Sequence, residues 1–548
     1  MRNQALHQNL IERVAMGDLL RRRSRDSAHL PALVDFHKGK RQELSYGELN
    51  SRVNQLAHGF ITKGLKQGDK LALISSNHSD MVTVYFACYK LGVVVVPINF
   101  MQSVDDIRYN FEHSESVAIV YENNFSELVL PCIEGNANIR FTTQIGPESG
   151  DADYCLDELI IGQSDSEIED RIIKDRDTAH LIYTSGTTSR PKAVESSHLA
   201  LMIAALTFSI EMEIAKQSKL LIVLPLFHCA ALSVLFPTLL RSGCVVIHGA
   251  FDPCLILDSI EQEKVETAGF LPMMWNALLA TPDVEKRDFS HFKTGIYAMS
   301  SMDGQILNRV RDVFGCLMHL GSGQTEFAPS ACLYRDKSAT EFDAGNYWGV
   351  PVCTVEQAII DEQGNELPQG KVGEIVWRGA QVMSGYFKNQ EASAQASQFG
   401  WHHSGDLGLI DSEGQLLFID RKKDTIKTGG ENVSSQKVEQ VLESFEGVMQ
   451  AAAFGVSHPH WGEAVCACVI AAPSVELDVA EIEKHCKAHL GKFEIPKTII
   501  LCETLPMTGT GKIRKVELRH QYRDIYPKPL ELQLGGKGTQ PHELRRTK

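Results

Sequence analysis

The chain has 548 residues, more than one ordinary hydrophobic core accommodates, so we expect at least two domains. Hydrophobic residues make up 43% of the chain and charged residues 22%, a balance typical of globular proteins. The formal net charge of −15 argues against a general affinity for nucleic acid or for an anionic membrane. It does not exclude anionic ligands held by local groups.

The 13 cysteines are scattered singly and form no CxxC pair, so neither a zinc ribbon nor a thioredoxin-like site is indicated. We expect most of them to be small buried residues. The polar residues 1–25 lack the apolar core of a secretory signal, and a cytoplasmic location is the default expectation. Residues 220–240 carry no Asp, Glu, Lys or Arg, but Pro225 and Pro237 would break a continuous helix. We therefore expect two buried elements joined at Pro225 and no integral membrane segment.

The apolar pattern of the first half of the chain predicts alternating helices and strands. Helical spacing covers 46–60, an apolar run covers 71–74, and a helix capped by Ser79 runs to about residue 91 before the buried strand 93–97. Strand, helix and strand in this order predict a βαβ unit with a parallel sheet. The run 244–247 and the pattern from 258 to 268 repeat the alternation.

The composition changes at five consecutive charged residues, 420–424. Beyond them we expect a helix over 437–442, strands over 451–456 and 465–470, a helix with apolar positions 479, 482, 486 and 490, and a strand over 498–501. The predicted fold is therefore α/β: a large N-terminal domain (1–420) of parallel and mixed sheets flanked by helices, and a small mobile α+β domain (421–526). Residues 527–548 are short of apolar side chains and are predicted to form a flexible tail.

The strongest local signal follows the apolar residues 181–182. It reads Tyr183-Thr184-Ser185-Gly186-Thr187-Thr188-Ser189-Arg190-Pro191-Lys192. Small and hydroxyl residues let a backbone fold closely around an anion with its N–H and O–H donors turned inward, and Lys192 and Arg190 add positive charge. The string predicts a polyphosphate site, although it is not the GxxxxGK[ST] loop.

This ordered string resembles the phosphate-binding signature of the adenylate-forming superfamily, which includes acyl-CoA synthetases, amino-acid adenylation domains and firefly-type luciferases. Further landmarks follow in the family's order, so the resemblance covers about residues 44–518. They are Pro225-Leu226-Phe227-His228, Gly323-Gln324-Thr325-Glu326, Gly349-Val350-Pro351, Ser404-Gly405-Asp406-Leu407, Asp420-Arg421-Lys422-Lys423-Asp424, Gly429-Gly430-Glu431-Asn432 and Pro506-Met507-Thr508-Gly509-Thr510-Gly511-Lys512-Ile513.

The resemblance implies ATP-dependent activation of a small-molecule carboxylic acid as an acyl-adenylate, with release of pyrophosphate and transfer of the acyl group to coenzyme A. Gly323 would belong to the nucleotide site, Thr325 would hydrogen-bond near the α-phosphate, and Glu326 would bind Mg²⁺, which prefers oxygen ligands. Asp406 would accept both ribose hydroxyls, and Arg421 would also reach the ribose.

The same resemblance assigns roles in the small domain. Lys512 would offset the charge that builds up when the carboxylate attacks the α-phosphorus. Lys423 would be the hinge about which the small domain rotates between half-reactions. Gly430, with Gly429, would line the passage for the pantetheine arm, because backbone without Cβ leaves room for a thiol chain. His228 resembles the residue of acyl-CoA synthetases that gates the carboxylate and the thiol passage.

The sequence departs from the family pattern at a few positions. Ser189 and Ala193 replace common glycines, and Ser189 occurs also in the crotonobetaine/carnitine-CoA ligase branch. Ser322 stands where an aromatic ring usually faces adenine, so stacking energy is expected to be missing. Ser300-Ser301-Met302 replaces Gly-Gly-Ala on the wall of the acyl pocket. Residues 229–232, Phe270, Tyr297 and Met299 are expected to line an apolar acyl pocket or to serve as core.

Three alternatives remain open beside the acyl-CoA synthetase. The chain could load a separate acyl carrier protein, although it carries no fused carrier. It could be a degenerate nucleotide-binding protein, but the joint presence of Lys192, Glu326, Asp406, Arg421 and Lys512 argues against that. Nothing in the sequence selects luciferase-type oxidation. The residues specify neither the acid nor the oligomeric state.

Overall fold

The computed structural model describes residues 2–36, 40–146, 150–184, 190–298, 302, 304–335, 347–507 and 512–526. The predicted tail and residues 185–189 lie outside the described part. The described chain divides into two compact units, and it passes from the first into the second between Lys422 and Lys423. The α/β fold predicted from the sequence is confirmed.

One sheet of the first unit carries the segment around the predicted phosphate loop. Its inner strands β3, β4, β5, β6 and β8 pair in parallel, whereas β9 pairs antiparallel with β8 and with β19. Across the sheet, the eight strands of the described chain are β19 (Gly385–Tyr386), β9 (Lys192–Ser197), β8 (Thr178–Thr184), β4 (Val94–Pro97), β3 (Lys70–Ile74), β5 (Ala118–Glu122), β6 (Phe141–Ile145) and β7 (Tyr154–Cys155).

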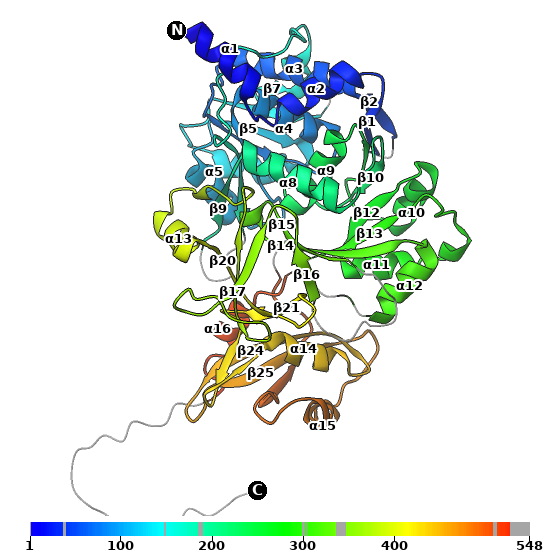
Figure 1. Cartoon of the computed structure of the whole chain (residues 1–548), viewed down its shortest axis with the longest axis vertical. Helices are drawn as coiled ribbons and strands as arrows, with labels where there is room; N and C mark the ends of the chain where they lie inside the picture. The colour runs from blue at the N-terminus through cyan, green and yellow to red at the C-terminus, as the bar shows by residue number, and fades with distance from the viewer. Residues whose placement is uncertain are drawn as a thin grey trace, which may run out of the picture. The chain divides into compact units, whose positions relative to one another are not determined.

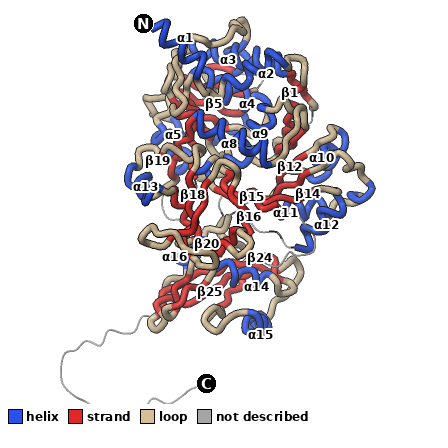
Figure 2. The backbone as a smooth tube through the Cα atoms, in the orientation of Figure 1, coloured by secondary structure: helices blue, strands red, loops and turns tan. Residues whose placement is uncertain are grey.

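A second sheet of the first unit is parallel in its middle and antiparallel toward β17. Figure 2 draws its strands in red. Across it, the 13 strands of the described chain are β17 (Glu356–Ile360), β18 (Gly373–Arg378), β20 (His402–Ile410), β21 (Leu416–Arg421), β16 (Tyr347–Pro351), β15 (Ser330–Arg335), β14 (Leu317–Gly323), β13 (Thr294–Tyr297), β12 (Thr267–Phe270), β10 (Lys219–Ile222), β11 (Cys244–Ile247), β1 (Pro31–Asp35) and β2 (Gln42–Ser45).

Helices pack against both sheets, and α8 and α9 lie side by side (Figure 1). The helices of the first unit are α1 (Arg2–Glu12), α2 (Asp18–Asp26), α3 (Tyr46–Thr62), α4 (Ser79–Leu91), α5 (Val104–Ser114), α6 (Ser126–Ile133), α7 (Leu156–Ile160), α8 (His198–Glu211), α9 (Cys229–Leu240), α10 (Pro253–Gln262), α11 (Pro272–Leu279), α12 (Gly304–Phe314) and α13 (Gln390–Gln395).

The predicted βαβ unit is confirmed as β3, α4 and β4. The two strands pair in parallel, and all three elements are almost fully buried. The predicted cap of α4 is wrong. His78 rather than Ser79 precedes the helix in extended conformation, and its Nδ1 accepts a hydrogen bond from Asp80 N at 3.3 Å. Ser79 is instead the first helical residue, and its N–H donates to Asp35 Oδ2 at 2.9 Å. An imidazole nitrogen thus accepts the hydrogen bond from a backbone N–H at the start of the helix, a role for which sequence preferences favour a serine hydroxyl.

The uncharged stretch 220–240 forms strand β10 and helix α9, with Pro225 in the connection, as predicted. Pro237 does not break α9, which continues to Leu240. A proline inside a helix removes a single hydrogen bond, and the packing of α9 against α8 and β10 outweighs that cost. Among the described residues, no helix has the length and apolarity needed to cross a membrane. Most cysteines are buried, as expected.

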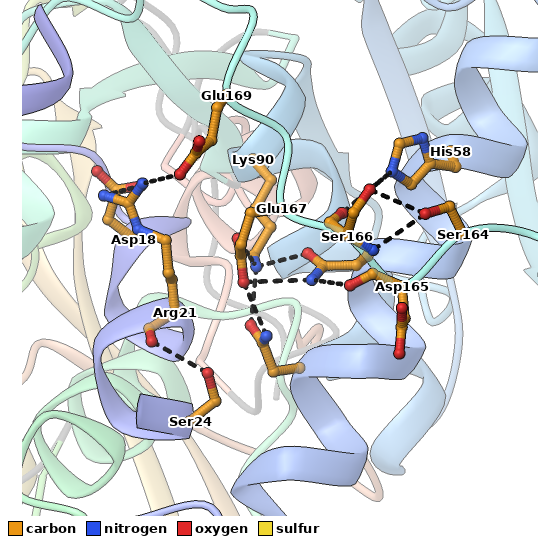
Figure 3. A network of polar contacts seen from close by, with 12 residues as sticks. Asp18, Arg21, Ser24, His58, Lys90, Ser164, Asp165, Ser166, Glu167 and Glu169 are labelled. Carbon is orange, nitrogen blue, oxygen red and sulfur yellow. Dashed lines mark hydrogen bonds and ion pairs between the residues drawn. The ribbon is translucent and has the colours of Figure 1, made fainter. Parts of the chain in front are cut away.

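A buried polar network holds the segment between α7 and β8 in place (Figure 3). Lys90 Nζ on α4 donates to Asn50 Oδ1 at 2.8 Å, to Asn54 Oδ1 at 2.6 Å and to Glu167 Oε2 at 2.7 Å. Both asparagine amides donate in turn to Glu167 Oε1. Arg21 pairs with Glu169 beside this cluster. The network thereby fixes the stretch of chain that leads into β8.

The second unit has an antiparallel sheet to which one parallel strand is added. Its strands among the described residues are β22 (Ile426–Thr428), β23 (Glu431–Val433), β24 (Val448–His458), β25 (Gly462–Ala471) and β26 (Thr498–Leu501), and its helices are α14 (Ser435–Glu443), α15 (Val479–His489) and α16 (Lys515–Gln521). The helices and strands predicted for 437–501 are all present. α14 and α15 cover one face of β24 and β25, and α16 covers the other.

Candidate functional site

Strands β8 and β9 bring the two ends of the predicted phosphate loop together. Thr184 ends β8 and pairs with Lys192 at the start of β9, and its Oγ1 donates to the Lys192 carbonyl at 3.3 Å. The Lys192 ammonium lies 4.3 Å from the ring centroid of Tyr386, a cation–π distance. Ser185, Gly186, Thr187 and Thr188 lie outside the described residues.

Tyr386 connects Lys192 with the predicted magnesium ligand. Its hydroxyl donates to Glu326 Oε1 at 2.7 Å, and the backbone of Met383 donates to the Glu326 carbonyl at 2.8 Å. Burial raises the pKa of the Tyr386 hydroxyl, and the charge of Glu326 raises it further, so the phenol stays protonated as a donor. A cation, an aromatic ring and a carboxylate thus form one contiguous corner.

The turn that presents Glu326 depends on a glycine. Gly323 has φ of +156°, and a Cβ at this position would lie 1.7 Å from the Pro329 carbonyl oxygen. A side chain would therefore force the backbone of the turn to move. Thr325 and Glu326 lie in the short 3₁₀ turn Thr325–Phe327 that follows at once. The position of both predicted residues is thus set by Gly323.

Gln324 ties this turn to the strand that carries Asp406. Its Nε2 donates to the Ser404 carbonyl at 3.1 Å, and its Oε1 lies 3.1 Å from His402 Nε2. Asp406 and Arg421 are direct cross-strand partners on β20 and β21, with Arg421 Nε 3.9 Å from Asp406 Oδ1. The two residues predicted to reach the ribose are therefore neighbours.

His228 lies at the start of α9, where its Nδ1 accepts a hydrogen bond from Ala230 N at 3.2 Å. The next residue, Cys229, places its sulfur 3.4 Å from Thr325 Oγ1. Cys229 and Thr325 line a small, largely apolar pocket of about 20 Å³ between α8 and α9, together with Leu201, Ala204, Leu232 and Phe236. That volume holds about one water molecule.

Other residues proposed for the acyl pocket lie elsewhere. Phe270 and Tyr297 are buried in a separate hydrophobic core, where Phe270 packs edge-on against Trp275 at 4.8 Å. Met299 and the segment 300–301 are outside the described residues. Ser322 is buried in β14, and a serine side chain has no ring that could stack on adenine.

The remaining predicted residues belong to the second unit. Lys423 is its first residue. Gly430 has φ of +89° in the turn between β22 and β23, and a Cβ there would meet no atom within 4 Å, so its conformation rather than close packing favours glycine. Lys512 lies between residues 508–511, which are not described, and Ile513, which pairs with Met507.

Sequence reasoning assigned no role to Tyr386 or to Gln324. Gln324 lies within a quoted motif, and its position between two predicted site residues is a signal that points to it. Tyr386 follows Gly385 in a segment without any predicted function, and its contact with Glu326 joins residues 60 positions apart. Only the pairing of β19 with β9 brings it to the site.

The sequence matches the family described as AMP-binding enzyme over residues 20–387, and the AMP-binding enzyme C-terminal domain over 437–512. The chain belongs to the AMP-binding enzyme family. It is 33% identical over 502 residues to a feruloyl-CoA synthase of Amycolatopsis sp, covering 91% of this chain and 98% of the relative. It is 29% identical over 518 residues to the long-chain-fatty-acid–CoA ligase FadD13 of Mycobacterium tuberculosis, covering 94% and 99%.

Solved structures of this family share the fold. ATP-bound MatB from Rhodopseudomonas palustris matches with a TM-score of 0.84 and 26% identity, covering 94% of this chain and all of that one. The o-succinylbenzoate CoA synthetase of Bacillus subtilis in complex with its acyl-adenylate matches with a TM-score of 0.81 and 27% identity, covering 94% and 99%. This family member is therefore an AMP-forming acyl-CoA synthetase, which uses ATP, a carboxylic acid and CoA.

Proposed function

We propose that the acyl-CoA synthetase binds the phosphates of ATP at the corner formed by Lys192, Tyr386 and Glu326. The observation that carries this proposal is the contact chain itself: the Lys192 ammonium faces the Tyr386 ring, and the Tyr386 hydroxyl binds Glu326. Tyr386 thus contacts a cation suited to phosphate oxygens through its ring, and a carboxylate suited to a metal ion through its hydroxyl. Such an arrangement suits a nucleotide polyphosphate with its counter-ion.

The ribose would lie beside Asp406 and Arg421. A carboxylate offers acceptor positions for two hydroxyl donors, and the Asp406 side chain is only 15% exposed, so it is held in one orientation. Gln324 links this strand to the turn of Thr325, which would donate near the α-phosphate. Gly323 would form the nucleotide wall between them, because no larger residue fits.

Glu326 is the proposed ligand of Mg²⁺. The hydrogen bond from Tyr386 engages Oε1, and a single carboxylate fits a metal that takes its other ligands from phosphate oxygens and water. Bound Mg²⁺ would neutralise charge on the phosphates. Among the described residues no cluster of three His, Cys, Asp or Glu side chains forms a metal cage, which agrees with a metal held mainly by the nucleotide.

Lys512 is the proposed cation of the first half-reaction. When the acid attacks the α-phosphorus, negative charge accumulates on oxygens that repel one another, and an ammonium stabilises that charge. One such donor contributes about 3 kcal/mol, or roughly a hundredfold in rate. We propose that rotation about Lys423 then removes Lys512, and that Gly430 borders the path of the thiol. The thiol attacks the mixed anhydride and AMP leaves. His228 would orient the carboxylate and gate this path.

The acid is proposed to be compact and apolar, of the size of ferulate. Support comes from the 33% identity to a feruloyl-CoA synthase. The pocket begins at Thr325, next to the proposed α-phosphate position. We further propose that the enzyme acts in the cytoplasm, where ATP and CoA are available.

A panel of acids tests the activity and the acceptor. AMP release is measured with ferulate, 4-hydroxybutyrate, o-succinylbenzoate and palmitate, each with CoA and with an acyl carrier protein. Fastest release with ferulate and CoA is expected. Release with the carrier protein alone would favour a carrier-loading enzyme, and faster release with palmitate would refute the compact acid.

Two variants test the residue roles. Lys512→Ala should abolish acyl-adenylate formation while sparing thiol transfer from supplied adenylate, and equal loss of both would contradict its role. Glu326→Ala should weaken binding of Mn²⁺ in the presence of ATP, followed by electron paramagnetic resonance, by at least tenfold. Exposed Glu391→Ala on α13 is the matched control. Unchanged Mn²⁺ binding by Glu326→Ala would overturn the metal assignment.

A further inference from the structure

The segment that follows Lys512 is fixed by its own backbone contacts. Ile513 pairs antiparallel with Met507, and Arg514 N donates to the Pro506 carbonyl at 2.7 Å. Helix α16 begins at the next residue, Lys515. Only Ile513 and Arg514 therefore separate Lys512 from the start of a helix. A contact that fixes the first turn of α16 therefore also restricts the backbone of Lys512 through this short connection.

Lys515 is bound into the second unit by a largely buried ion pair. Its Nζ lies 2.8 Å from Glu439 Oε1 and donates to Ser435 Oγ at 2.6 Å. The Lys515 and Glu439 side chains are only 12% and 14% exposed. Ser435 and Glu439 lie one helical turn apart on α14, so they face Lys515 from the same side. Lys515 is thus held at two points of one helix.

Glu439 is itself held by the sheet. Its Oε1 accepts a hydrogen bond from Ala453 N on β24 at 2.7 Å. The carboxylate therefore joins α14, β24 and α16 at one atom. A backbone N–H of the sheet thus helps to fix the carboxylate that binds Lys515.

A second contact ties α16 to the segment next to the proposed hinge. Arg519 Nη2, one turn after Lys515, lies 3.0 Å from Asp424 Oδ1. Asp424 directly follows Lys423. Leu518, which lies between Lys515 and Arg519 in the sequence, is 2% exposed and packs in the hydrophobic cluster of β24 and β25. Helix α16 is thereby fixed along its length to the same unit that begins at the hinge.

We propose that Lys515 is a positioning residue, whose ion pair with Glu439 fixes the backbone of Lys512 for acyl-adenylate formation. The inference rests on the proposed role of Lys512. The short connection through Ile513 and Arg514 carries the restraint from Lys515 to Lys512.

An ion pair suits positioning better than stabilisation. Buried pairs add little net stability, because the cost of removing two charges from water offsets their attraction, but they accept few geometries. A misplacement of about 1 Å at a reacting group costs on the order of a hundredfold in rate. Loss of the pair should therefore appear in the half-reaction that uses Lys512 and not in the one that does not.

The test measures the two half-reactions separately in the full chain. Acid-dependent pyrophosphate release reports acyl-adenylate formation, with the panel acid that the wild-type enzyme uses fastest. Thioester formation from the supplied acyl-adenylate and CoA reports transfer. Lys515→Met is expected to slow adenylate formation about tenfold to a hundredfold and to leave transfer within twofold. Lys515→Arg, which retains the charge, should recover most of the lost rate.

Two further variants keep the test decisive. Lys484→Met removes an exposed lysine–glutamate pair of the same unit, with side chains 77% and 57% exposed, and should change neither half-reaction. Because Lys515→Met leaves Glu439 buried without its partner, its folding is checked by thermal melting. The neutral double variant Glu439→Gln/Lys515→Met removes that cost and should melt near wild type while adenylate formation stays slow.

The outcomes separate this inference from the proposed function. Wild-type adenylate formation in Lys515→Met or in the double variant would overturn the positioning role, and so would an equal fall in both half-reactions. If the wild-type enzyme forms no acyl-adenylate, or if Lys512→Ala forms it at the normal rate, the proposed function fails first.

Discussion

Replacing Glu167 by glutamine should destabilise the first unit, because it removes the charge that faces buried Lys90. The Lys90 residue is 4% exposed, and its ammonium makes three contacts of 2.6–2.8 Å (Figure 3). Two of the partners are the neutral oxygens of Asn50 and Asn54. Glu167 is the only carboxylate among the three, and glutamine has nearly the same shape. The substitution therefore removes the charge and one acceptor oxygen and leaves the shape of the side chain almost unaltered.

The magnitude follows from the burial of the two partners. Breaking a buried ion pair costs about 3–5 kcal/mol, since one charge is left without compensation. The Glu167 side chain is 22% exposed, and the asparagine oxygens stay in contact with Lys90, so the cost falls below that range. We expect the free energy of unfolding to drop by about 2–3 kcal/mol. The double variant Lys90→Met/Glu167→Gln removes both charges and should recover part of this loss.

Guanidinium unfolding of the full chain measures this effect. In a Trp461→Phe background, the four remaining tryptophans, at positions 275, 348, 377 and 401, all belong to the first unit and report its transition. Asp283→Asn is the matched control, because it neutralises an acid whose pair with Lys286 has side chains 69% and 77% exposed. Such a surface pair contributes about 0–1 kcal/mol. If Glu167→Gln shifts the midpoint no more than Asp283→Asn, the buried network does not stabilise the unit as reasoned.

Three further results are expected. Burial alone would raise the pKa of Glu167, but Lys90 and the two asparagines outweigh burial and lower this pKa. The stabilisation by the ionised carboxylate is therefore present above about pH 4.5 and is lost as the pH falls through the lowered pKa. The difference in stability between wild type and Glu167→Gln should accordingly shrink in unfolding curves measured at acid pH. Gly323→Ala should lower the melting temperature by several degrees, whereas Gly321→Ala on the same strand, where a Cβ meets nothing within 4 Å, should barely change it; equal shifts would contradict the steric argument. Asp406→Asn should weaken ATP binding in calorimetry about tenfold or more through loss of hydrogen bonds to a charged group, with little change in melting, and unaltered ATP affinity would remove Asp406 from the ribose site.

The sequence predicted those parts of the fold that depend on a single local pattern. Buried strands such as 93–97 and 244–247 are short apolar runs between polar residues, and their burial in parallel sheets follows directly. The predicted roles of Ser79 and Pro237 were wrong, because propensities are averages over many structural contexts. Here a neighbouring carboxylate takes the N–H of Ser79, and packing holds a proline within α9.

The sequence indicates candidate site residues where they lie in contiguous motifs, as Thr325 and Glu326 do. It gives no such indication for Tyr386, because the contacts of Tyr386 depend on the pairing of Gly385 with Glu195 and of Tyr386 with Val194, between strands that periodicity does not align. The same holds for the link from Gln324 to His402 and Ser404, about 80 residues away.

These long-range contacts have a chemical consequence. A lone carboxylate on a short turn would rotate freely, and its affinity for a cation would suffer from the entropy of ordering it. The Tyr386 hydroxyl, kept protonated by burial and by the charge it faces, holds Oε1 of Glu326 at 2.7 Å. At the proposed nucleotide site, this contact would remove that freedom before a nucleotide binds. The ring of Tyr386 likewise restricts the ammonium of Lys192 through the cation–π contact. Tyr386→Phe retains the ring and loses only the hydroxyl, so it should weaken metal-dependent ATP binding while the contact with Lys192 persists.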